Sequence, residues 1–187
     1  MLFAYPLSFI LPVSMSFENG LIENLQVAIL VLSCIYNLRL FQISKNRQIK
    51  IFNLWCAALS MLLAFRELSW GRVFYQIGIE EGGPVFVPMS DYAWRTETNI
   101  LIGIYALILI FMLMKMPLMM MFHCRPPYLV LFIMILAVIF SYVGDHGMFF
   151  GKLQGQIIEE FGELSFYTLI PTLCIYYNRE LSNKLQN

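Results

Sequence analysis

The sequence predicts an all-α protein, a polytopic transmembrane helical bundle of about five spanning helices, on three observations. The 187 residues are 59% hydrophobic and 13% charged, with a mean hydropathy of +0.70, far outside the range of soluble domains. Five segments are long and apolar enough to cross a bilayer, which takes about twenty helical residues. Polar or Gly- and Pro-containing stretches separate them. We therefore expect one transmembrane domain over residues 1–187.

The elements follow in order from these breaks. KNRQIK follows the first apolar segment, EGGP follows the second, two prolines precede the fourth and GDHG follows it. The predicted spans are 21–41, 51–70, 99–117, 127–144 and 156–177. Residues 1–17 are apolar, but they contain Pro6 and Pro12 and lack the basic residues with which a signal peptide begins, so they do not fit a signal peptide. They predict a short apolar N-terminal interfacial segment, with a sixth crossing as the alternative.

The basic residues predict the orientation, because Lys and Arg in short loops stay on the cytoplasmic side. Eight of the 12 fall on one alternating side: Arg39, Lys45, Arg47, Lys50, Lys115, Arg125, Arg179 and Lys184. We expect an integral plasma-membrane protein, the bacterial inner membrane being the preferred case, with the N-terminus outside and the C-terminus cytoplasmic. All acidic residues except Glu180 then fall on the outer side. The four cysteines fall in the cytoplasmic half, where we expect reduced packing residues.

The formal net charge is zero, and the basic residues form no stripe that would follow a phosphate backbone. Nucleic acid is therefore excluded as a partner. The expected partners are the lipid bilayer and either a lipid-linked substrate or other membrane subunits.

The strongest functional signal is the stretch IIEEFGELSFYTLI at 157–170, because carboxylates are costly in hydrocarbon. At 100° per residue, Glu159, Glu160 and Glu163 share one arc of about 100° with Gln156 and Tyr167. Glu163 lies about two turns into the span, beyond the first turn, where the helix dipole stabilises an anion. It therefore needs a shared proton, an arginine or a cation as partner.

Three other spans bring polar groups to the same level of the bundle. They come from the start of the first span, the end of the second and the end of the fourth. Their head-group or ligand-binding candidates are Arg66, Arg72, Glu67, Glu23, Gln26 and Trp70. Asp145 and His146 follow the fourth span. Capping explains Glu23, Glu159 and Glu160 individually, and ion pairing explains the arginines, so a purely structural interpretation stands beside the functional one.

An acid/base enzyme needs a proton-exchanging carboxylate, a base and a cationic clamp. The candidate catalytic residues are Glu163, Glu159, His146 and Asp145. A site at this level faces the outer leaflet, so the expected substrate is a lipid or a lipid-linked molecule.

A metal-assisted version is also open, with a divalent ion as cofactor. Its predicted ligands are Glu159, Glu163, Glu160 and His146, an oxygen-rich set that suits Mg, Mn, Fe or Zn. No H-x-x-x-H or E-x-x-H pattern fixes the geometry, and the arginines compete for the same carboxylates.

Three functions remain in order of preference. The first is an enzyme of the outer leaflet. The second is a non-catalytic subunit of a larger membrane complex, which would present its apolar third span to a partner. The third is a cation or proton transporter, and the uniformly apolar fourth span, LVLFIMILAVIF, counts against it.

Overall fold

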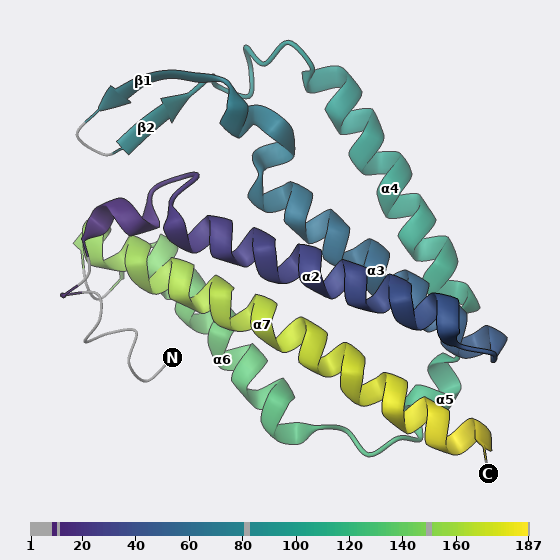
Figure 1. Ribbon diagram of the computed structural model, residues 1–187. Coiled ribbons are helices and arrows are strands. Elements are labelled where there is room, and N and C mark those ends of the chain that lie inside the picture. Colours follow the sequence, from purple (N-terminus) through teal and green to yellow (C-terminus); the bar gives the residue numbers. More distant parts are fainter. Residues whose placement is uncertain (1–8, 11, 81–82, 149–150, 187) are drawn as a thin grey trace.

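The computed structural model describes residues 9–10, 12–80, 83–148 and 151–186, and it confirms the predicted all-α bundle (Figure 1). The elements, in chain order, are the 3-10 helix η1 (Val13–Ser16), the helices α2 (Leu21–Ile43) and α3 (Arg47–Glu67), the 3-10 helix η2 (Ser69–Phe74), the strands β1 (Gln76–Glu80) and β2 (Gly83–Phe86), and the helices α4 (Arg95–Lys115), α5 (Leu118–Phe122), α6 (Tyr128–Asp145) and α7 (Gly151–Gln186). The predicted interfacial segment at 1–17 lies mostly outside the described residues.

Four described helices are long and apolar enough to cross a membrane: Ser14–Ile43, Arg47–Glu67, Arg95–Lys115 and Tyr128–Asp145. The helices α2, α3, α4 and α6 match the first four predicted spans to within four residues, although the first apolar segment begins at Ser14 and not at residue 21. The predicted fifth span lies inside α7, which has 36 residues and is therefore about 54 Å long. α7 is not among these four. Five described helices are therefore long enough to cross a membrane, as predicted, but only four of them are also apolar enough.

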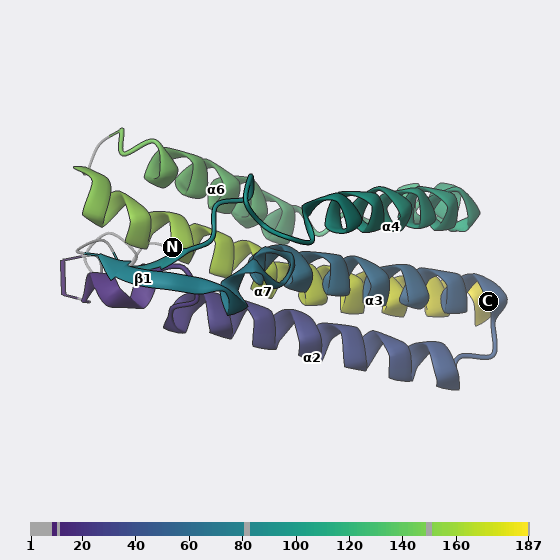
Figure 2. The ribbon, with the colours of Figure 1, turned by 90° about the horizontal axis from the view of Figure 1, so that it is seen from above.

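The helices form a bundle in which α2, α3 and α7 pack against one another. α6 packs on α7, and α4 packs on α3. Figure 2 shows α4 and α6 on one side of the α3–α7 pair and α2 on the other. The interface between α3 and α7 is therefore covered by α2 on one face and flanked by α4 and α6 on the opposite face.

Glycines allow α6 and α7 to approach closely. A Cβ added to Gly162 would lie 2.7 Å from the backbone nitrogen of Ser141, and one on Gly144 would lie 2.5 Å from the backbone nitrogen of Glu159. Small residues at a helix crossing are the usual means of association in a membrane, where lipid competes equally for apolar side chains. This contact fixes the N-terminal half of α7, which carries the three glutamates, against α6.

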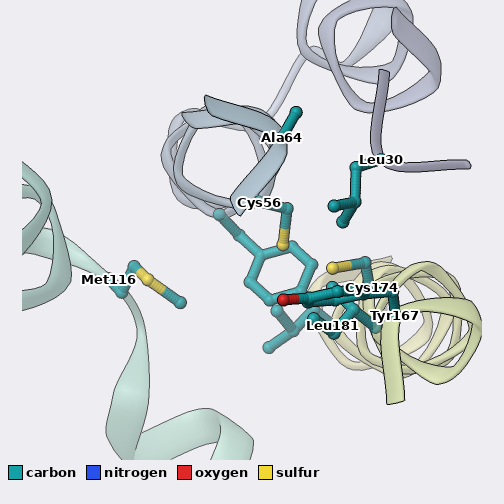
Figure 3. Close-up of a cluster of buried hydrophobic side chains, with 9 residues drawn as sticks. Leu30, Cys56, Ala64, Met116, Tyr167, Cys174 and Leu181 are labelled. Carbon is teal, nitrogen blue, oxygen red and sulfur yellow. The ribbon is translucent and has the colours of Figure 1, made fainter. Parts of the chain in front are cut away.

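Buried polar side chains join α2, α3 and α7. Ser33 and Ser60 are hydrogen-bonded through their hydroxyl oxygens at 3.0 Å, and the Nδ2 of Asn53 donates to the Oδ1 of Asn178 at 3.0 Å. Buried apolar side chains pack between these two hydrogen bonds, and Cys56 of α3 lies next to Cys174 of α7 in this cluster (Figure 3). Interhelical hydrogen bonds of this kind set the rotation of each helix about its axis.

The connection after α3 differs from the prediction. The second span was expected to reach residue 70, but α3 ends at Glu67 because Ser69 and Trp70 have φ of 44° and 55°, followed by Gly71 at 90°. These left-handed residues form the first half of η2, and an antiparallel β-hairpin of β1 and β2 follows. The sequence prediction included no strand there and treated EGGP only as the break after the second span.

Candidate functional site

Arg66, in the last turn of α3, links α3 to α7. Its Nη2 lies 3.2 Å from the Oε1 of Glu163, and its Nη1 lies 3.2 Å from the Oε1 of Glu67. Nη1 also donates to the hydroxyl of Tyr167, and that hydroxyl donates to the Oε1 of Glu67 at 2.6 Å. These four residues form a closed hydrogen-bonded network, named here the Arg66 cluster. Arginine is therefore the partner that the structure gives to Glu163.

Burial divides the Arg66 cluster into an inner and an outer part. The side chain of Glu67 is 6% exposed and Tyr167 is 1% exposed, so both are buried. The side chain of Glu163 is 18% exposed, whereas that of Arg66 is 56% exposed. The buried pair holds the guanidinium in place, and its outer edge is left open to a ligand.

A pocket of about 190 Å³ lies beside the cluster, between α3, α6 and α7. Arg66, Glu163 and Tyr167 form its polar wall, and the remaining lining residues are Leu63, Ala137, Val138, Ser141 and Phe166. One guanidinium and one carboxylate therefore face the same space, which is otherwise mostly apolar.

Glu160 points to α2 and not to the Arg66 cluster. The fully buried Gln26 donates from Nε2 to the carbonyl oxygen of Glu160 at 3.1 Å and to its carboxylate at 3.0 Å. The Oε1 of Gln26 has no hydrogen-bond partner among the described residues. Glu23 lies in the first turn of α2 and accepts a hydrogen bond from the backbone of Asn19, as the capping interpretation expects. That interpretation is wrong for Glu159 and Glu160, because α7 begins at Gly151 and both residues lie beyond its first turn.

Arg72 and Trp70 lie apart from the Arg66 cluster. Arg72 pairs with Glu18, and the hydroxyl of Ser69 donates to the same carboxylate at 3.1 Å. The indole ring of Trp70 stacks on Phe65 with 5.7 Å between ring centroids. These contacts support the turn into the hairpin. They do not bring either predicted ligand-binding residue to Glu163.

Asp145 and His146 are also separate from the cluster. The Nδ1 of His146 lies 3.4 Å from the Oδ2 of Asp145 and 3.0 Å from the carbonyl oxygen of Tyr142. Both side chains are exposed at the C-terminal end of α6. Glu159 lies within electrostatic range of Asp145, Glu163 and Arg66. Of the polar groups that were predicted to meet at one level of the bundle, the structure therefore brings together the acids of α3 and α7 and Arg66, but not the imidazole of His146.

The predicted metal ligands do not converge. Glu163 pairs with Arg66, Glu160 with Gln26, and His146 lies against Asp145 and Tyr142. Within the part of the chain that the structure describes, no group of three or more His, Cys, Asp or Glu side chains is placed to hold a metal ion. The described residues therefore do not fit the metal-assisted version of the site.

Two residues that make these contacts were not among the predicted site residues: Tyr167 of the Arg66 cluster and Glu18, the partner of Arg72. Tyr167 was recognised only as part of the polar arc, although its position four residues after Glu163 places it on the same helix face. Glu18 precedes the first span, where no periodic pattern relates it to Arg72.

Comparison with known proteins finds no matching family model, no similar curated protein and no similar solved structure.

Proposed function

We propose that this protein is an enzyme that acts by acid/base chemistry on a lipid or lipid-linked substrate in the outer leaflet of its membrane. One observation carries the proposal: Arg66 exposes its guanidinium to a pocket that it shares with Glu163. The four apolar helices provide the membrane location on which the proposal depends.

Each member of the Arg66 cluster has a role in this proposal. Arg66 would bind an anionic head group, because guanidinium groups form strong charge-assisted hydrogen bonds with phosphate and carboxylate. Glu163, held 3.2 Å from the same guanidinium, would exchange the proton. Glu67 and Tyr167 are positioning residues, since their contacts fix the buried side of Arg66.

The proton balance of the proposed reaction is simple. The Glu163 carboxylate would accept a proton from an attacking hydroxyl group as that oxygen bonds to the substrate. Glu163 would then return the same proton to the oxygen of the leaving group. Arg66 would stabilise negative charge on the substrate during both steps. A hydrolysis and a transfer to another hydroxyl both fit this scheme.

The test compares the lipids of cells that lack the protein with those of cells that produce it, using mass spectrometry. We expect a lipid species to change on deletion, and we expect wild-type protein to restore it. Glu163→Gln should fail to restore it at normal protein level, because the amide cannot take up the proton. The matched control is Glu97→Gln, an exposed outer glutamate of α4. Restoration by Glu163→Gln equal to the wild type would overturn the proposal.

A non-catalytic subunit is the second candidate, and α4 is the observation in its favour. Only 11% of the apolar 18-residue stretch of α4 is buried in the bundle. α4 contacts α3 through a hydrogen bond from the Nε1 of Trp55 to the carbonyl oxygen of Leu109 at 3.1 Å, among other contacts. Such a face fits a partner helix, although lipid covers it equally well. Co-purification of a stoichiometric partner through α4 would place this candidate first. A transporter remains the third hypothesis.

A further inference from the structure

A second pocket, with a volume of about 390 Å³, is rich in sulfur-containing side chains. Five of them line it: Cys56 of α3, Cys174 of α7, Met116 just after α4, Met121 of α5 and Met134 of α6. Its other lining residues are aliphatic or aromatic, and none of them is acidic or basic. Thiol and thioether groups are therefore the main ligands that this pocket offers to a bound ion.

The two cysteines of this pocket are in direct contact. Their thiols are hydrogen-bonded to each other, and Figure 3 shows their sulfur atoms turned toward one another from α3 and α7. Cys56 is 1% exposed and Cys174 is 7% exposed. The other two cysteines, Cys34 and Cys124, do not line the pocket. Tertiary packing thus brings two thiols that are distant in the sequence to one buried position.

Thioether groups lie between this thiol pair and the surface. Met119 of α5 is 72% exposed, whereas Met116 is 7% exposed and packs in the same buried cluster as the two cysteines. Met121, two residues after Met119, lines the pocket. α5 lies at the end of the bundle that carries the C-terminus (Figure 1). The predicted orientation places this end in the cytoplasm, a reducing compartment that keeps thiols free.

The chemistry of these ligands favours one kind of ion. Thiolate and thioether groups are soft ligands that select Cu(I), whereas Mg²⁺ and Ca²⁺ require oxygen ligands. Zn²⁺ takes four ligands in its structural sites, and the pocket offers two thiols. Charge is costly in apolar surroundings. Cu(I) carries a single positive charge, so the pocket gains no net charge when this ion replaces the proton of one thiol.

We infer that Cys56 and Cys174 form a binding site for one Cu(I) ion. The ion bonds to both sulfur atoms, and the proton of one thiol leaves to a base in solution, because the thiolate is the form that binds a metal. No electron is transferred, so copper remains Cu(I). This site uses no residue of the Arg66 cluster and does not depend on the proposed enzyme activity.

The test is a competition for Cu(I) between the purified, reduced full chain and the chelator bicinchoninate, in detergent and without oxygen. We expect the chain to take one Cu(I) ion from the coloured complex, which lowers its absorbance, and to release about one proton per ion. X-ray absorption at the copper edge should then show only sulfur neighbours. A wild-type chain that takes up no Cu(I), or a copper shell containing nitrogen or oxygen, would overturn the inference.

Matched cysteine variants locate the ion. Cys56→Ser and Cys174→Ser should each lower the affinity by at least about 100-fold, the upper range for loss of a partner that only supports a ligand. Cys34→Ser is the control and should bind like the wild type, because Cys34 does not line the pocket. If neither pocket variant elutes as folded protein, the X-ray absorption of the wild type decides alone.

A second control distinguishes the thiol pair from the surface of α5. His123 and Cys124 follow α5 and offer an imidazole and a thiol beside the exposed Met119. Cys124→Ser should leave the affinity for Cu(I) unchanged. Loss of binding in Cys124→Ser, with normal binding in Cys56→Ser, would place the ion at α5 and would overturn the inference.

Discussion

At the residue scale, the hydroxyl of Tyr167 is the central group of the candidate site. It accepts from the guanidinium of Arg66 and donates to the carboxylate of Glu67. Tyr167 is 1% exposed and the side chain of Glu67 is 6% exposed, so the bond between these two buried groups is shielded from water. Buried polar groups that lose their partners are among the most costly local defects in a folded protein.

Tyr167→Phe should therefore destabilise the protein by about 1–3 kcal/mol, because it leaves the buried Glu67 with one hydrogen-bond donor fewer. The measurement is thermal unfolding of the purified protein in detergent. Tyr128→Phe is the control, since Tyr128 is 75% exposed and should shift stability by less than about 0.5 kcal/mol. Equal unfolding temperatures for the two variants would contradict the network.

The sequence could predict that Glu163 needs a partner but not which one. Helical periodicity places Glu163 on a polar face, and the cost of a charge in hydrocarbon demands compensation. The choice among a proton, an arginine and a cation depends on how α3 is rotated relative to α7. That rotation follows from side-chain packing and interhelical hydrogen bonds such as Asn53 to Asn178, which have no local sequence signature.

At the element scale, the close crossing of α6 and α7 positions the acidic turns of α7. Gly144, Gly155 and Gly162 occupy the crossing, and a Cβ on any of them would come within 2.7 Å of backbone atoms of the opposite helix. Backbone atoms cannot move aside as a side chain can, so α6 and α7 would have to separate.

Gly162→Ala should cost about 1–3 kcal/mol, the usual penalty for overfilling a packed contact. Gly103→Ala on α4 is the matched control, because its Cβ would meet nothing within 4 Å. That variant should instead gain about 0.5–1 kcal/mol from the better helix propensity of alanine. Thermal unfolding of both variants in one detergent measures the difference. A Gly162→Ala protein as stable as the wild type would contradict the tight crossing.

The elements themselves were largely predictable, and their ends were not. Apolar length and polar breaks located five helices, since these features reflect the bilayer directly. The end of α3 depends on left-handed Ser69 and Trp70, which are residue types that rarely adopt positive φ. The extension of α7 beyond residue 177 is stabilised by Leu181, which is fully buried against the bundle. Both features arise from tertiary contacts.

At the scale of the whole molecule, the predicted orientation places the Arg66 cluster at the exterior face. The prediction follows from eight basic residues on one alternating side. In the structure the N-terminal ends of α2 and α7 lie at the same end of the bundle as the C-terminal end of α3 (Figure 1), and the side of the membrane that this end faces stays a prediction.

In a chain whose four cysteines are replaced by serine or alanine, single cysteines test this orientation. Ser90→Cys should react with a membrane-impermeant maleimide added to intact cells, because residue 90 precedes α4 on the outer side. Asn183→Cys, exposed near the end of α7, should react only after the membrane is permeabilised. Labelling of Asn183→Cys alone in intact cells would reverse the orientation and place the site at the cytoplasmic face.

The pocket beside the Arg66 cluster, which is lined by α3, α6 and α7, has a kinetic consequence for the proposed enzyme. If its substrate enters from the lipid phase, as the proposal requires, the mole fraction of that ligand in the bilayer sets occupancy rather than its aqueous concentration. Adding inert lipid at a constant amount of ligand would then slow turnover by surface dilution. Adding buffer would leave it unchanged.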